Sequence, residues 1–146
     1  MMAATEASSA ASAEITSAAG ARGDIGSLPS WRLRRVTDYV QQNLDKDLTL
    51  AELAAVLCMS PFHFARLFKC STGVPPHRFV VRQRITRART CLAMEGQSIA
   101  QISRMVGYRT PSHFTTVFRR ALGVTPGAYR AAALQANRSN EEGGGK

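Results

Sequence analysis

This chain of 146 residues lacks the features that mark membrane and exported proteins. No apolar run approaches the roughly 20 residues that a membrane-spanning helix needs. The amino terminus has no Lys or Arg before Arg22 and no continuous apolar segment. We therefore expect no membrane contact and no signal peptide, and we place the protein in the cytoplasm.

Cysteine is scarce, and no pattern of catalytic residues is present. Cys58, Cys70 and Cys91 are odd in number and lack CxxC spacing, which argues against a disulfide framework or a zinc site. Buried or incidental thiols are the better interpretation. The sequence also has no nucleophile paired with a base, no glycine loop for phosphate and no cluster of metal ligands. We expect neither an enzyme nor a bound cofactor or metal.

Acidic residues are almost missing from the middle of the chain. Residues 60–130 contain twelve Arg or Lys and a single acid, Glu95, so the whole net charge of +9 lies in this block. A surface that is merely soluble needs no such segregation. The block therefore predicts a polyanionic partner, with nucleic acid as the default.

The two ends have little apolar content with a regular period. Residues 1–29 are dominated by Ala and Ser and predict a disordered arm. Residues 135–146 predict a flexible tail. The folded domain is expected to cover residues 30–134.

One segment occurs twice in this domain. SPFHFARLFKCSTGVPPHRF begins at Ser60, and TPSHFTTVFRRALGVTPGAY begins fifty residues later at Thr110, with seven identical positions. Upstream, LAELAAVL from Leu50 pairs with IAQISRMV from Ile99. A repeat of this length is one supersecondary unit used twice.

Apolar spacing and capping residues predict about seven helices and no strand, which is an all-α fold. Ser–Pro and Thr–Pro at residues 60–61 and 110–111 start the second helix of each copy. A long helix from Pro76 to about Met94 connects the copies and spans roughly 28 Å. That length would place the two units about one turn of DNA apart, so that one monomer spans two major grooves.

Each copy has the form of a helix-turn-helix unit. Short turns at residues 58–59 and 107–109 join the helix pairs. The second helices have apolar residues at core spacing, namely Phe64, Leu67, Phe68, Phe114, Val117 and Phe118. In such motifs the outward residues of the second helix contact base edges in the major groove.

Residues from about Trp31 to Leu134 resemble the DNA-binding domain of the AraC/XylS family of bacterial transcription regulators. The resemblance covers LTLAELAAVLCMSPFHFARLFKCSTGVPP, RFVVRQRITRARTCLAMEGQSIAQIS and VGYRTPSHFTTVFRRALGVTPGAYR. It implies two helix-turn-helix units joined by a long central helix. It also implies a sequence-specific regulator that binds double-stranded DNA, with activation as the favoured mode, contact with RNA polymerase and a location on the nucleoid.

The resemblance also implies roles for individual residues. Base contacts are expected in the first groove from Phe62, Ala65 and Arg66, and in the second from Ser112, Thr115 and Thr116. Phosphate contacts are expected from Lys69, Arg109, Arg119 and Arg120. Two positions depart from the family pattern: Thr116, where Arg is frequent, and Cys58, where a small turn residue such as Gly is common.

Several side chains have alternative roles. Arg66 could bind guanine or form a surface ion pair, and Phe62 could meet a thymine methyl or cover the edge of the core. His63 and His113 fit packing beside the following Phe, or a phosphate contact, better than a metal site. Arg84 is expected to be structural. The remaining arginines of the block are candidates for phosphate contact or for solvated positions: Arg78, Arg82, Arg87, Arg89 and Arg104.

The function also has alternatives. A nonspecific nucleic-acid-binding protein would carry a similar charge, although the chain lacks the aromatic platforms on which RNA readers stack bases. A module that docks on RNA polymerase is compatible with the DNA-binding hypothesis. The chain resembles short stand-alone members of the family, or a domain cut from a longer protein.

Overall fold

The computed structural model describes residues 26–144, which form seven α-helices and no strand. The helices are α2 (Ser30–Gln42), α3 (Leu50–Val56), α4 (Pro61–Thr72), α5 (Pro76–Leu92), α6 (Ile99–Met105), α7 (Pro111–Leu122) and α8 (Pro126–Gly144). The all-α prediction is confirmed.

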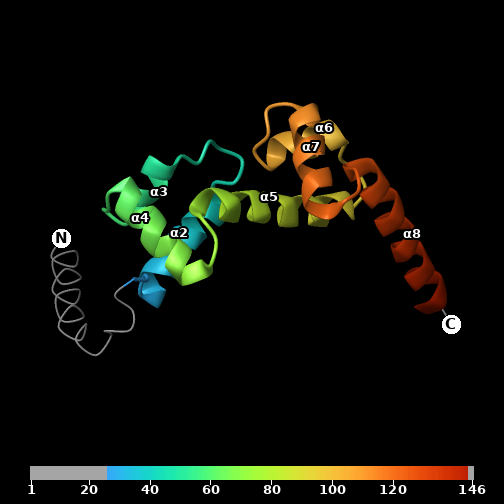
Figure 1. Ribbon diagram of the computed structural model, residues 1–146. Helices are drawn as coiled ribbons and strands as arrows, with labels where there is room; N and C mark the ends of the chain where they lie inside the picture. The colour runs from blue at the N-terminus through green and yellow to red at the C-terminus, as the bar shows by residue number, and fades with distance from the viewer. Residues whose placement is uncertain (1–25, 145–146) are drawn as a thin grey trace, which may run out of the picture.

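Helix α5 connects two separate helical units (Figure 1). Helices α2, α3 and α4 pack in sequence against one another and then against α5, whereas α6, α7 and α8 pack at its other end. Helix α5 has 17 residues, which gives a length of about 25 Å. The predicted arrangement of two helix-turn-helix units on a long connecting helix is confirmed.

Each unit has its own apolar core. The first core is built mainly from α2, α3 and α4, and its buried residues include Val36, Val40, Leu53, Phe64, Leu67, Phe68 and Val80. The second is built from α5, α6 and α7, and its buried residues include Ile85, Ala88, Leu92, Ile102, Tyr108, Phe114 and Phe118. The apolar residues predicted for the core are thus buried, with Val117 partly so.

The second helix of each unit begins and ends with the same local signals. The hydroxyl oxygens of Ser60 and Thr110 accept hydrogen bonds from the backbone N–H groups of His63 and His113, at 3.3 and 3.1 Å. Proline follows each cap, and a left-handed glycine ends each helix. The two helices therefore have the same length of 12 residues.

The turns of the two units share a left-handed residue. Cys58 has φ +56° in the first turn, and Gly107 has φ +97° in the second. A side chain at such a position costs about 1–2 kcal/mol, which explains why a small residue is common there. The side chain of Cys58 is exposed.

The last helix is longer than predicted. Helix α8 extends to Gly144 and so includes most of the segment that is predicted as a flexible tail, residues 135–146; the last two positions lie outside the described residues. Residues 131–136 are mostly Ala, Leu and Gln, which are strong helix formers. The side-chain amide of Asn137 also donates to the carbonyl oxygen of Ala93 at 3.1 Å, which ties the added turns to the end of α5.

The amino-terminal boundary also differs from the prediction. Residues 1–25, which make up most of the predicted disordered arm, lie outside the described residues. Leu28, however, is buried in the first core, and its backbone N–H donates to the Ser71 hydroxyl at 2.7 Å. The folded region therefore begins before residue 30.

Within residues 26–144 no single helix is long and apolar enough to cross a membrane. Helices α3 and α4 are so only when taken together, and they are bent by 79° relative to each other.

Candidate nucleic-acid interface

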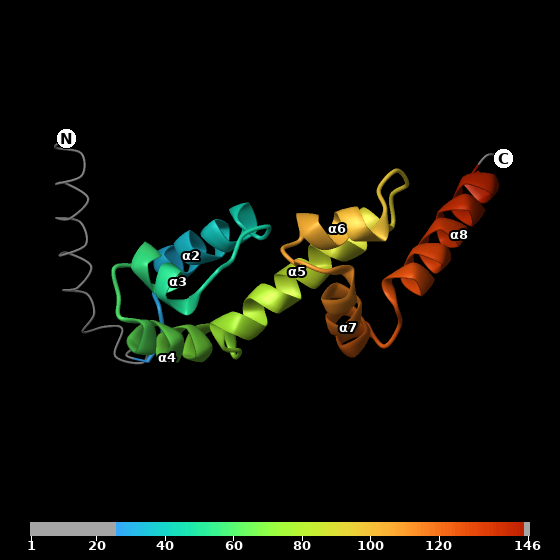
Figure 2. The same cartoon turned by 90° about the horizontal axis from the view of Figure 1, so that it is seen from above.

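Helices α4 and α7 lie toward the same side of the molecule. Figure 2 shows both helices along one edge of the view, with α2 and α6 toward the opposite edge. Each of the two helices buries two phenylalanines in the core of its unit, so its other face points away from the protein. These two faces contain all six side chains predicted to contact bases.

The outward face of α4 combines an aromatic and a cationic side chain. Phe62 is 79% exposed, which rules out the alternative that it covers the edge of the core. Arg66 is exposed, one helical turn further on, and has no acidic partner among the described residues. Ala65 between them is half-buried. Arg66 is therefore free to extend its guanidinium away from the helix, as a base contact requires.

The outward face of α7 has hydroxyl groups instead. Ser112 and Thr116 are exposed, and Thr115 is half-buried. The Thr116 hydroxyl donates to the carbonyl oxygen of Ser112 at 3.1 Å. That internal bond occupies the donor of Thr116, so this hydroxyl can only accept a further bond unless it rotates.

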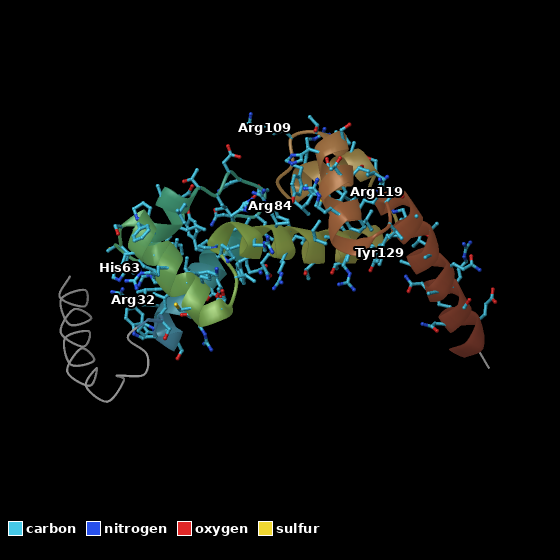
Figure 3. The ribbon with its side chains drawn as sticks, in the orientation of Figure 1. Arg32, His63, Arg84, Arg109, Arg119 and Tyr129 are labelled. Carbon is cyan, nitrogen blue, oxygen red and sulfur yellow. The ribbon has the colours of Figure 1, made fainter. Side chains whose placement is uncertain are left out.

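Two arginine side chains lie beside the hydroxyl groups of α7. Thr115, Thr116, Arg119 and Arg120 line an open cavity of about 360 Å³. Both arginines are exposed, as is Lys69 at the corresponding end of α4; Figure 3 shows Arg119 on α7. The guanidinium groups are positively charged and only donate hydrogen bonds, and the neighbouring hydroxyl groups can donate or accept. This combination suits an anionic ligand.

The fourth predicted phosphate contact, Arg109, already has a partner. Its guanidinium lies 3.2 Å from the Asp47 carboxylate, and this is the single ion pair among residues 26–144. The two side chains are 86% and 75% exposed, so solvent screens the pair and its contribution is about 0–1 kcal/mol. So weak a pair leaves Arg109 able to exchange Asp47 for a phosphate.

Several other arginines have internal roles. The Arg84 guanidinium donates to the carbonyl oxygens of Leu44 and Lys46, which confirms its predicted structural role. Arg87 donates to the carbonyl oxygen of Gln41, and Arg89 to the Tyr129 hydroxyl. A phosphate contact by Arg87 or Arg89, which the sequence offers as candidates, would compete with these partners.

The histidines and cysteines form no site in the described part of the chain. The His113 ring packs edge-on against Tyr108, with ring centroids 5.2 Å apart. His63 is exposed on α4. Cys91 is buried, whereas Cys58 and Cys70 are exposed. No group of three or more His, Cys, Asp or Glu side chains is placed to hold a metal ion within residues 26–144.

Comparison with known proteins identifies the repeated unit. The family described as "Helix-turn-helix domain" matches residues 53–132, which include both turns, α4, α5, α6 and α7. The regulatory protein PocR of Salmonella typhimurium is 37% identical over 99 residues, which are 68% of this chain and 33% of that protein. The chain thus spans about a third of the length of this curated relative.

Two solved structures have the same arrangement of helices. A transcriptional regulator of Chromobacterium violaceum, described as containing an AraC-type DNA-binding domain, is 27% identical with a TM-score of 0.67, covering 73% of this chain and 95% of that one. The DNA-binding domain of the global transcriptional factor AdpA, solved in complex with a target DNA, is 33% identical with a TM-score of 0.68, covering 73% and 96%. Because the family match covers more than half of the chain and both units align with AraC-type domains, this chain belongs to the AraC/XylS family.

Proposed function

We propose that this chain binds double-stranded DNA sequence-specifically and regulates transcription, with α4 and α7 in two adjacent major grooves. One observation carries the proposal: two helices with the same length and the same caps lie on the same side of the molecule. Both belong to the stretch of residues 60–130, which contains a single acid. An α-helix fits the major groove of B-DNA, and its outward residues can reach base edges there. The AdpA domain, which has the same fold, was solved on a target DNA.

The base contacts are assigned to the six outward side chains. On α4, Arg66 bonds to the O6 and N7 of a guanine, Phe62 meets a thymine methyl group, and Ala65 allows close approach. On α7, Ser112, Thr115 and Thr116 make single hydrogen bonds, which many bases satisfy. The first unit is therefore more selective for base sequence, and the second is held mainly by contacts with the DNA phosphates.

The phosphate contacts are assigned to Lys69, Arg109, Arg119 and Arg120. These four side chains are exposed. Each phosphate that they neutralise releases a counterion, so affinity falls steeply with salt concentration.

A single chain suffices for both grooves under this proposal. Both readers belong to one polypeptide, and α5 connects them. Contact with RNA polymerase, activation rather than repression, and a cytoplasmic location on the nucleoid complete the proposal. It includes no enzymatic activity and no cofactor.

Binding stoichiometry and specificity test the proposal directly. We expect one chain to bind one selected, asymmetric site of two half-sites about one helical turn (~34 Å) apart. Its affinity there should exceed that for random DNA by about 10³-fold or more at the same salt concentration. Selection from a random library, followed by titration with analysis of complex mass, measures both quantities.

Two outcomes would count against this expectation. Equal affinity for selected and random DNA would favour the nonspecific nucleic-acid-binding alternative. A strict requirement for a palindrome bound by two chains would show that a monomer does not read both grooves.

Substituting Arg66 distinguishes contacts with DNA bases from contacts with DNA phosphates. Arg66→Ala should weaken binding to the selected site by about 1–3 kcal/mol and relax the preference at one base pair. Arg119→Ala, the matched control on the other helix, should weaken all sequences alike because its contact is with phosphate. Affinities for every single-base variant of the site, measured for both proteins, decide the assignment. If Arg66→Ala kept the full base preference, Arg66 would not be the base contact.

A further inference from the structure

The relative placement of the two units depends on few contacts. Their apolar cores share no buried residue. On α5, Val80 is buried in the first core, whereas half-buried Val81 and buried Ile85 belong to the second. Helix α5 joins the units, and α4 of the first unit and α6 and α8 of the second pack on it. Besides α5, direct contacts between the units hold the direction in which α4 and α7 point relative to each other.

Arg84 makes the central contact between the units. It lies on α5 between them (Figure 3). Its Nε donates to the carbonyl oxygen of Leu44 at 3.1 Å, and one terminal nitrogen donates to that of Lys46 at 2.7 Å. Both carbonyls belong to the segment that follows α2 in the first unit. The planar guanidinium thus holds this segment with two bonds of fixed relative direction.

The same guanidinium contacts the second unit. Its central carbon lies 5.4 Å from the centre of the Tyr108 ring, a distance at which cation and ring attract. Burial raises the pKa of Tyr108, with the nearby Arg84 charge opposing the shift, so the ring stays neutral at physiological pH. Arg84 is therefore sandwiched between backbone carbonyls of one unit and an aromatic ring of the other.

The backbone of the turn between α6 and α7 packs against the same groups. A Cβ atom added to Gly107 would lie 2.2 Å from the Leu44 carbonyl oxygen and 2.6 Å from Cζ of Arg84. The turn therefore lies directly against both groups. The outer ion pair between Arg109 and Asp47 also crosses between the units, but solvent screens it and its contribution is small.

We infer that Arg84 is a positioning residue that sets the spacing between the two half-sites that the protein accepts. The inference rests on the proposed function, since it concerns how the two readers are held relative to each other. Adding one base pair between half-sites moves the second groove by about 3.4 Å and rotates it by about 35°. If α4 and α7 are held rigidly relative to each other, the protein binds the altered site more weakly. Without the Arg84 contacts, the two helices can adjust to the new spacing.

The first test measures affinity for sites with altered spacing. The wild-type protein should lose about tenfold or more in affinity when one base pair is inserted or removed between half-sites. Arg84→Met keeps the length of the side chain but removes both bonds, and we expect its affinities for the three spacings to agree within about threefold. Arg84→Lys, which retains the charge without the fork, should be intermediate.

Arg130 provides a matched control. Its guanidinium also donates two bonds to backbone carbonyls, those of Leu92 and Met94, at 3.2 and 3.3 Å. Donor and acceptors here belong to the second unit alone. Arg130→Met should therefore lower thermal stability while leaving the spacing preference as in the wild type. A general loss of stability is thereby separated from a loss of positioning.

The second test needs no DNA. Spin labels on Cys70 at the end of α4 and on a cysteine introduced by Ala121→Cys at the end of α7 report the distance between the two reading helices; both positions are exposed. Exposed Cys58 is replaced by glycine, which suits its left-handed backbone, and buried Cys91 is kept. We expect a narrow distance distribution for this labelled protein with Arg84 intact. The same labelled protein with Arg84→Met should give a broader or shifted distribution.

The two tests distinguish the inference from the function on which it rests. An unchanged distance distribution in Arg84→Met, or an unchanged spacing preference, would overturn the positioning role of Arg84. A wild-type protein that prefers no DNA sequence at any spacing would instead overturn the proposed function.

Discussion

Replacing Gly107 with alanine should destabilise the protein by about 2–5 kcal/mol, through a left-handed backbone and a steric clash together. Gly107 has φ +97°, and its added Cβ would lie 2.2 Å from the carbonyl oxygen of Leu44. A backbone oxygen cannot rotate away as the end of a side chain can, so the segment after α2 has to shift. That shift also disturbs both hydrogen bonds that Arg84 makes to this segment.

Gly123→Ala is the matched control for this prediction. Gly123 is also left-handed, with φ +82°, but apart from its two neighbours in the chain nothing lies within 4 Å of its added Cβ. Its substitution should cost only the conformational term, about 1–2 kcal/mol. Urea denaturation followed by circular dichroism gives both free energies of unfolding. Equal costs for the two variants would mean that the close approach at Gly107 does not constrain the fold.

Phe64→Ala should destabilise the first unit by about 3–5 kcal/mol, because it removes a fully buried ring. The Phe64 ring packs against Phe68 with centroids 5.5 Å apart, and Phe68 in turn packs on Phe79. The protein has a single tryptophan, Trp31, at the start of α2 in the same unit. Its fluorescence during denaturant unfolding therefore reports the stability of this unit.

Phe62→Ala is the control, two residues away on the same helix. Phe62 is 79% exposed, so its loss should change the free energy of unfolding by no more than about 0.5 kcal/mol. Its cost should appear in affinity for the selected DNA site. A large stability loss in Phe62→Ala would show that this ring packs on the protein in solution and is unavailable to DNA.

Much of the local structure followed from residue types and their spacing. The Ser60 and Thr110 caps, the prolines after them and the glycines that end both helices act within a few residues, so their effect is readable in sequence. The spacing of Phe64 and Phe68 identified the buried side of α4, since residues four apart share one face of a helix. The outward face then followed by elimination, although its contacts with DNA remain predictions.

Sequence and structure differ where a segment's state depends on distant partners. The predicted tail became part of α8, where Asn137 bonds to the end of α5. Leu28 is buried in the first core, although it belongs to the Ala- and Ser-rich segment that predicts a disordered arm. Arg87 and Arg89, which resemble solvated arginines in sequence, have partners 46 and 40 residues away.

The sequence by itself determined the two helix-turn-helix units, because caps, apolar period and the repeat are local or periodic signals. Only the tertiary structure decided how the units are placed relative to each other. That placement depends on the bonds of Arg84 to the carbonyl oxygens of Leu44 and Lys46 and on the close approach of Gly107. Every residue has a carbonyl oxygen, so no residue type reveals which one an arginine forty positions away will bind; the folded chain alone selects it.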